Sequence, residues 1–236
     1  MTNRFLLAAV LCLFAGSAFA GDPASNAPPA EAVAKPNETA AVPPSAPVDM
    51  GQAAVGDHWT YDLTDEISGE VKARTTATIT EISSNNVTIR TERVGADTVG
   101  IIVYDNSWNV VRSGAQRFSP NDGSGIELPL EVGKTWKIRS DRIESTGAIW
   151  KKEGESKITG KEKITTKAGE FDAFVIETKF SAQNVNDRSR KTESTVRTWF
   201  SPNVNHWVKR STEFHVNGHL LQNYVIELTS YGRKKA

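Results

Sequence analysis

The chain has 236 residues, enough for one large domain or two small ones. Charged residues make up 24% of it and hydrophobic residues 38%, and 28 basic residues balance 28 acidic ones. This composition excludes a fully disordered chain, a polytopic membrane protein and a strongly basic nucleic-acid-binding protein.

The first twenty residues have the layout of a secretory signal peptide. Arg4 precedes an apolar run from Phe5 to Ala15, and Ala18-Phe19-Ala20 forms an A-x-A cleavage pattern. The apolar run is too short for a membrane-spanning helix, which needs roughly twenty residues. We therefore expect export with cleavage after Ala20, and no transmembrane segment in the mature chain.

The single cysteine, Cys12, lies inside this apolar run. The mature chain is therefore expected to contain no disulfide, no thiolate metal site and no cysteine nucleophile. An exported protein without disulfides is typical of a bacterial periplasm, which we predict as its location.

Residues 21–50 contain seven of the ten prolines and no aromatic residue. Such a segment buries too little apolar surface to fold, and its prolines keep it extended. We predict a disordered tether over 21–50, followed by a single antiparallel β domain over 51–236.

From Gly56 onward the sequence alternates between apolar and polar residues, as half-buried strands do. No segment carries a sustained helical apolar stripe with caps. The pattern predicts an all-β fold with few or no helices: a curved antiparallel sheet, half-open barrel or sandwich. The expected strands cover 58–63, 71–80, 87–89, 99–103, 108–112, 136–140, 157–165, 171–180, 192–200, 207–214 and 220–231.

Asn217-Gly218 marks the turn of the last hairpin, whose register decides which face is buried. A two-residue loop leaves both faces mixed, whereas a three-residue loop pairs Phe214 with Leu220. We predict the three-residue loop, because it gathers the apolar residues on one face. They are Val208, Phe214, Leu220, Tyr224, Ile226 and Leu228.

Two segments, Val99–Val103 and Phe171–Phe180, are apolar on both faces. A strand in a one-sided sheet should alternate with polar residues, so these need a second covering layer or a ligand. We expect a concave face that is apolar enough for an acyl chain, with a directly packed second sheet as the alternative.

No cluster in the sequence makes a convincing catalytic or metal site. His215 and His219 face each other in the predicted hairpin, but two ligands are too few for zinc. The remaining candidates are typical of turns and solvated strand ends, and we predict no catalytic residue, metal ligand or cofactor. Those candidates are Ser124 between two glycines, Gly133-Lys134-Thr135, His58, His206, and the carboxylate pairs Glu153/Glu155 and Glu170/Asp172.

Six tryptophans are the one enriched feature of the sequence. Exposed tryptophans stack on sugar rings, whereas buried ones fill the core and need a partner for the indole N–H. Strand parity favours the core for most of them. The exception is Trp199, which lies opposite in parity to Val196 and Phe200.

The C-terminal third resembles a widespread group of poorly characterised bacterial exported proteins. The resemblance rests on the motifs Gly169-Glu170-Phe171, Trp199-Phe200-Ser201-Pro202, Trp207-Val208-Lys209 and Glu227-Leu228-Thr229-Ser230-Tyr231, in this order. It implies a curved antiparallel sheet similar to the half-closed barrels of periplasmic lipoprotein carriers, and it transfers no catalytic residue.

Three functions follow as hypotheses. The first is a non-enzymatic periplasmic protein that binds an apolar or envelope-derived ligand, such as a lipid, on a concave sheet. The second is a tethered interaction module that contacts envelope proteins during envelope assembly. The third is a hydrolase of cell-wall polymer, which only the carboxylate pairs and tryptophans favour. Nucleic acid is not an expected partner, because basic and acidic residues are interleaved.

Overall fold

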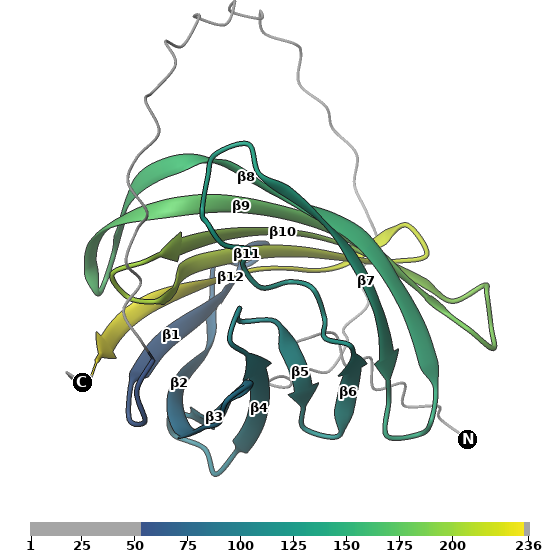
Figure 1. Cartoon of the computed structure of the whole chain (residues 1–236), viewed down its shortest axis with the longest axis horizontal. Coiled ribbons are helices and arrows are strands. Elements are labelled where there is room, and N and C mark those ends of the chain that lie inside the picture. The colour runs from purple at the N-terminus through teal and green to yellow at the C-terminus, as the bar shows by residue number, and fades with distance from the viewer. Residues whose placement is uncertain (1–52, 234–236) are drawn as a thin grey trace, which may run out of the picture. The chain divides into compact units, whose positions relative to one another are not determined.

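The computed structural model describes residues 53–233, which form a closed barrel of twelve antiparallel strands and contain no helix (Figure 1). The signal peptide, its cleavage site, Cys12 and the whole predicted tether lie outside the described residues. The strands are β1 (His58–Asp65), β2 (Val71–Ile82), β3 (Asn86–Arg93), β4 (Val99–Asp105), β5 (Val110–Ser113), β6 (Gln116–Ser119), β7 (Thr135–Ile143), β8 (Ile149–Thr166), β9 (Gly169–Asn184), β10 (Lys191–Ser201), β11 (His206–Val216) and β12 (His219–Gly232).

Each strand pairs with its neighbour in the chain, and β1 pairs with β12 to close the barrel. Trp59 lies opposite Tyr231 and Asp65 opposite Tyr224 along this closing seam. The prediction of an all-β antiparallel fold is confirmed. The barrel is closed, however, and differs in this from the half-closed carriers suggested by the resemblance. Closure gives the first and last strands a partner on both sides, whereas β7 pairs with β6 only over its last three residues, Asp141–Ile143.

Alternation along the strands builds the core inside the barrel. On β1 the side chains of Trp59, Tyr61 and Leu63 are buried, and Ile79 and Ile89 continue this inner layer on β2 and β3. Burial of each such side chain contributes on the order of 1.5–3 kcal/mol. Aromatic residues fill the end of the barrel near the start of β1.

The middle of the inner face is more polar than the sequence led us to expect. Most strands place serine or threonine hydroxyl groups at buried, inward positions. The hydroxyl groups of Ser156 on β8 and Thr178 on β9, for example, form a hydrogen bond of 2.9 Å. The inner face is therefore amphipathic. These hydroxyl residues include Thr75, Thr91, Ser113, Ser140, Ser156, Thr178, Ser194, Thr198 and Thr212.

The predicted register of the last hairpin is wrong. Val216 lies opposite His219, so the turn has two residues, Asn217 and Gly218, whose φ angles are 49° and 83°. Two successive positive φ angles match the twist of a hairpin, which explains the Asn-Gly pair. A bulge then shifts the ladder, so that Phe214 lies opposite Gln222 instead of Leu220.

The predicted buried face of that hairpin is nevertheless mostly correct, because the bulge adds one residue and restores parity. Phe214, Tyr224, Leu228 and Val208 are buried. Leu220 lies before the bulge and is 48% exposed, and Ile226 is half-buried.

The two segments that are apolar on both faces have different surroundings. On β4, Val99 is 51% exposed and Ile101 36%, so nothing in the barrel covers their side. On β9, both faces are buried: Ile176 faces the interior, and Phe171 packs edge-on against Tyr231 with ring centroids 5.8 Å apart. Among residues 53–233 there is one sheet, so no second sheet covers β9.

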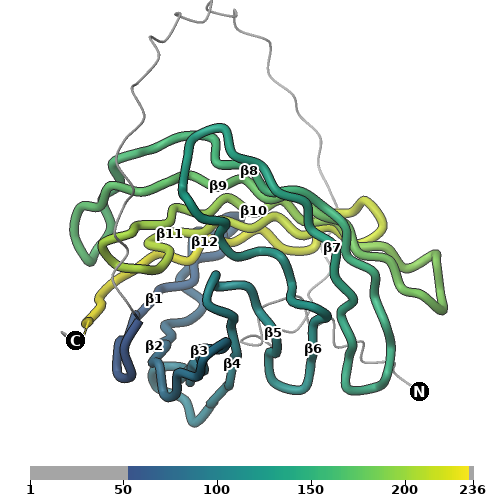
Figure 2. Tube along the Cα trace, viewed as in Figure 1, coloured from purple at the N-terminus to yellow at the C-terminus, as the bar shows by residue number. Residues whose placement is uncertain are grey.

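The β8–β9 hairpin covers this outer face with its own tip, which lies beside β12 and β1 (Figure 2). The Glu162 carboxylate accepts hydrogen bonds from the Trp199 indole and the Arg197 guanidinium, both at 2.7 Å. The Lys167 ammonium lies 2.8 Å from the Asp62 carboxylate on β1. The long hairpin therefore folds over the outside of the sheet and buries Trp199 there.

Candidate functional site

A cluster of aromatic rings surrounds His206 at one end of the barrel. Its imidazole stacks on Trp59, with centroids 4.3 Å apart, and lies 3.6 Å from the Trp207 ring and 4.9 Å from the Trp108 ring. His206 is 1% exposed. The prediction that it is a solvent-facing turn residue is wrong, because it begins β11 and points inward.

Hydrogen bonds fix the orientation and tautomer of this histidine. Tyr61 donates its hydroxyl proton to the Trp207 carbonyl at 2.9 Å, so Nδ1 of His206 must donate to the Tyr61 oxygen at 2.6 Å. Its Nε2 is buried and has no hydrogen-bond partner among the described residues. Burial, and secondarily the charge of Arg210, lower the pKa of His206 well below its ordinary value. The ring is therefore neutral.

Two turns position the aromatic cluster. Asn205, in the β10–β11 turn, accepts a hydrogen bond from the Trp108 indole at 3.3 Å, and the neighbouring Val204 carbonyl accepts one from Trp59 at 3.3 Å. Trp108 has a φ of 61° in the β4–β5 turn. Bulky residues rarely adopt this conformation, and such strain is concentrated at functional sites.

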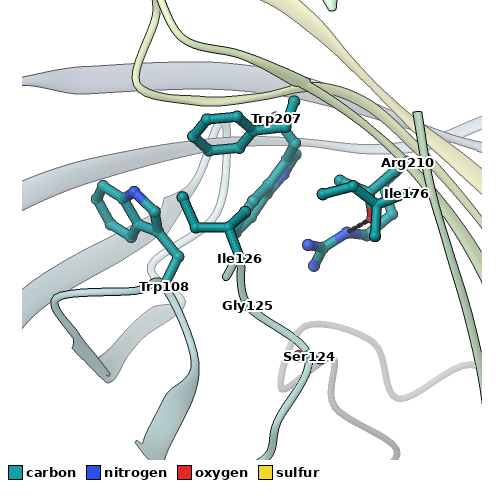
Figure 3. A pocket seen from close by; sticks show the side chains of 9 residues that line it. Trp108, Ser124, Gly125, Ile126, Ile176, Trp207 and Arg210 are labelled. Atoms are coloured by element: carbon teal, nitrogen blue, oxygen red, sulfur yellow. Dashed lines mark hydrogen bonds between the residues drawn. The ribbon is translucent and has the colours of Figure 1, made fainter. Parts of the chain in front are cut away.

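A small cavity lies beside this cluster, under the connection between β6 and β7 (Figure 3). Ser124, Gly125 and Ile126 of that connection form one wall, and Trp207 and Arg210 of β11 lie across from them. Its free volume is about 10 Å³, room for roughly one water molecule. In this conformation the cavity is too small for an acyl chain.

Arg210 brings a positive charge into the cavity. Its Nε donates to the Thr198 hydroxyl at 3.0 Å, and its guanidinium lies 4.0 Å from the centroid of the Trp207 ring (Figure 3). Within residues 53–233, no carboxylate forms an ion pair or hydrogen bond with it. Burial lowers the pKa of Arg210, yet an arginine in a protein remains charged.

The carboxylate nearest in the interior, Asp122, is engaged elsewhere. It is fully buried, accepts the backbone N–H of Val110 at 2.7 Å and lies 3.5 Å from the Lys152 ammonium. Lys152 also donates to the Asp122 carbonyl at 2.7 Å. This interior therefore contains Lys152 and Arg210 against one carboxylate, an excess of one positive charge.

The same contacts hold the β6–β7 loop, residues 120–134, over the end of the barrel. Gly125 packs so closely on the β4–β5 turn that an added Cβ would lie 2.2 Å from the Ser107 carbonyl oxygen. Connections of this length without regular structure often cover binding sites. In this conformation the loop covers the cavity beside Arg210.

Other sequence candidates lie apart from this cavity. His215 lies opposite Leu220 and not His219, and no group of three or more metal-ligating residues occurs in residues 53–233. Glu155 and Asp172 are exposed on the barrel exterior, where they pair with Lys137 and Lys163. The Gly133-Lys134-Thr135 segment leads into β7, as predicted for a turn.

Sequence reasoning was correct about most tryptophans and missed the cavity residues. Five of the six tryptophans are buried, and Trp136 is half-buried at the start of β7. Arg210 and Asp122 gave no signal, because they become neighbours only when the barrel closes. Ser124 lines the cavity, and its hydroxyl donates a hydrogen bond to the Asp122 carboxylate.

No protein-family model matches the chain, and no curated protein matches it. Among solved structures, a "putative lipoprotein" from Parabacteroides distasonis matches 80% of this chain and 100% of its own, at 12% identity and a TM-score of 0.50. This likeness shows the fold alone. The hypothetical lipoprotein YmcC from Escherichia coli matches 77% of this chain and 85% of its own, at 10% identity and a TM-score of 0.45. Among residues 53–233 there is no helix of the length and apolarity that crossing a bilayer requires.

Proposed function

We propose that this protein is an exported, non-enzymatic binding protein that takes an envelope-derived, amphipathic ligand into the capped end of its barrel. The predicted signal peptide supports export, and the structural neighbour from Parabacteroides distasonis is a "putative lipoprotein". The carboxylate pairs are exposed, and one member of each, Glu155 and Asp172, pairs with a lysine, which argues against the hydrolase hypothesis.

Arg210 is the observation that carries this proposal. Arg210 is half-buried, and a partly desolvated cation without a carboxylate partner is typical of a functional site. Around it, Trp108, Ile126 and Phe200 supply apolar walls. Pockets that combine apolar walls with a few polar groups are typical of small-molecule binding.

Ligand entry requires the β6–β7 loop to move, since the cavity holds only about one water molecule. The loop makes this feasible, because its middle part pairs with no strand between Ser124 and Val132. Leu128 and Val132 on this stretch are 53% and 56% exposed. Movement of residues 124–132 would open the cavity without breaking the barrel.

The direct test is mass spectrometry of lipids and other amphiphiles that co-purify with the full chain from a bacterial periplasm. A second measurement titrates a fluorescent fatty acid while tryptophan emission is followed, because Trp108 and Trp207 line the cavity. We expect saturable quenching and a higher melting temperature. If a saturating probe changes neither and no amphiphile co-purifies, the binding function is refuted.

The exposed Leu128 and Val132 also favour a second candidate, the interaction module for envelope proteins. Replacing both with serine should then abolish partner capture from periplasmic extract without affecting fatty-acid binding. The opposite pattern, in which fatty-acid binding alone changes, assigns these residues to the entry route.

A further inference from the structure

We propose that the cavity beside Arg210 is an anion-binding subsite, which takes the carboxylate or phosphate headgroup of an amphiphile. This inference rests on the proposed function, because it specifies the chemical class of the ligand proposed there. Two hydrogen-bond donors, the Arg210 guanidinium and the Trp207 indole, and one excess positive charge define this class.

The two donors flank the same cavity. Trp207 is 7% exposed, and its Nε1 has no hydrogen-bond partner among the described residues. The Arg210 guanidinium lies over the Trp207 ring at 4.0 Å and points toward the Gly125–Ile126 wall (Figure 3). Only its Nε is engaged, by Thr198. The Trp207 indole is thus a buried donor without a partner, and the two Nη groups of the half-buried Arg210 are further donors beside it, which an oxyanion satisfies.

The electrostatic surroundings favour a negative group as well. Asp122 is the buried carboxylate whose charge acts on Arg210, and it also interacts with Lys152. Tyr61, Tyr104 and Tyr224 are the remaining titratable groups that act on Arg210, and burial raises the pKa of each. They are neutral phenols at physiological pH. One monoanionic headgroup would balance the excess charge of Lys152 and Arg210 over Asp122.

The size of the cavity limits how the headgroup binds. One oxygen atom fits in place of a single water molecule, next to Arg210 and Trp207. The remainder of the ligand must then occupy the space vacated by the β6–β7 loop, against Trp108 and Ile176. A guanidinium suits this role because it offers several donors in a fixed plane to carboxylate or phosphate oxygens.

The test compares two amphiphiles with the same chain, decanoate and decan-1-ol, on the full chain by tryptophan emission. We expect decanoate to bind about tenfold more tightly or better, because hydrogen bonds to charged groups are roughly twice as strong as neutral ones. Inorganic phosphate alone should raise the melting temperature and compete with decanoate.

Arg210→Met should remove the preference for decanoate while decan-1-ol binding persists. Arg210→Lys should keep part of the preference for decanoate, and Trp207→Phe should reduce the affinity for decanoate by a few fold. Arg112→Met is the matched control, because Arg112 is exposed on the outside of β5 and should leave both affinities unchanged. Melting temperatures report whether each variant folds.

The outcomes separate this inference from the proposed function. Equal binding of decanoate and decan-1-ol, or a preference that survives Arg210→Met, overturns the anion subsite but leaves the binding function standing. Binding of neither amphiphile, with an Arg210-dependent effect of phosphate, refutes the amphipathic ligand and supports the subsite. If phosphate and both amphiphiles have no effect, both proposals fail.

Discussion

The neutral His206 makes folding stability depend on pH in a way that one substitution can isolate. In the folded protein its imidazole lies among Trp59, Trp108 and Trp207, with Arg210 as the nearest charge acting on it. In the unfolded chain it titrates near its ordinary value of 6.5. Below this pH the unfolded chain binds a proton that the folded protein does not, so stability falls as pH falls.

The magnitude follows from linkage. One proton of difference changes the free energy of unfolding by about 1.4 kcal/mol per pH unit. Because the folded pKa of His206 lies well below 6.5, this loss continues as the pH falls below 6.5 until the folded protein takes up the proton as well. The stability that this group contributes is fully present above about pH 6.5.

The assay is urea unfolding of the wild type and His206→Gln at several pH values between about 7.5 and 4.5. The variant is less stable at neutral pH, because it loses ring stacking. The gap between the two should shrink by about 1.4 kcal/mol per unit below pH 6.5. His219→Gln, an exposed residue of the β11–β12 hairpin, should follow the wild type. A gap that stays constant over this range would mean that His206 takes up its proton in the folded barrel, and the reasoning would be refuted.

Three further substitutions test the packing. Asp122→Ala should cost about 3–5 kcal/mol in urea unfolding, because it removes the carboxylate that pairs with the buried Lys152 ammonium, and adding Lys152→Met should restore part of this loss. Gly125→Ala should displace the β6–β7 loop, lower the melting temperature and change tryptophan emission, whereas unchanged values would refute the close approach. Phe214→Ala should lower the free energy of unfolding by about 3–5 kcal/mol, and Leu220→Ala by about 0.5 kcal/mol or less. Losses of similar size in the two variants would contradict the observed register.

The alternation of apolar and polar residues was enough to predict the strands and, for most of them, the face that is buried. Parity correctly assigned Trp59, Tyr61 and Leu63 to the interior, and turn residues separated most strands. Parity failed at bulges, because one extra residue exchanges the two faces. The bulge before Phe200 leaves both Trp207 and Val208 buried, which no strict alternation predicts.

The closure of the barrel could not be predicted, because it depends on pairing between the first strand and the last. That pairing spans almost the whole domain, from His58 to Gly232, and has no local sequence signal. The site shares this difficulty. Arg210 resembles any strand arginine in the sequence, and only closure places it opposite Gly125 and Ile126 of the β6–β7 loop.

The position of Arg210 along the barrel explains why an amphipathic ligand fits the interior better than a purely apolar one. On one side of it lie the aromatic rings of Trp207 and Trp108, and on the other the inward hydroxyl groups of Thr178 and Thr212. An acyl chain alone would displace water from the half-buried guanidinium and offer no acceptor to its two Nη groups. A ligand with an anionic head satisfies the cation and directs its apolar part toward the rings under the β6–β7 loop. The charge of Arg210 thus selects the ligand class, and the loop determines its access.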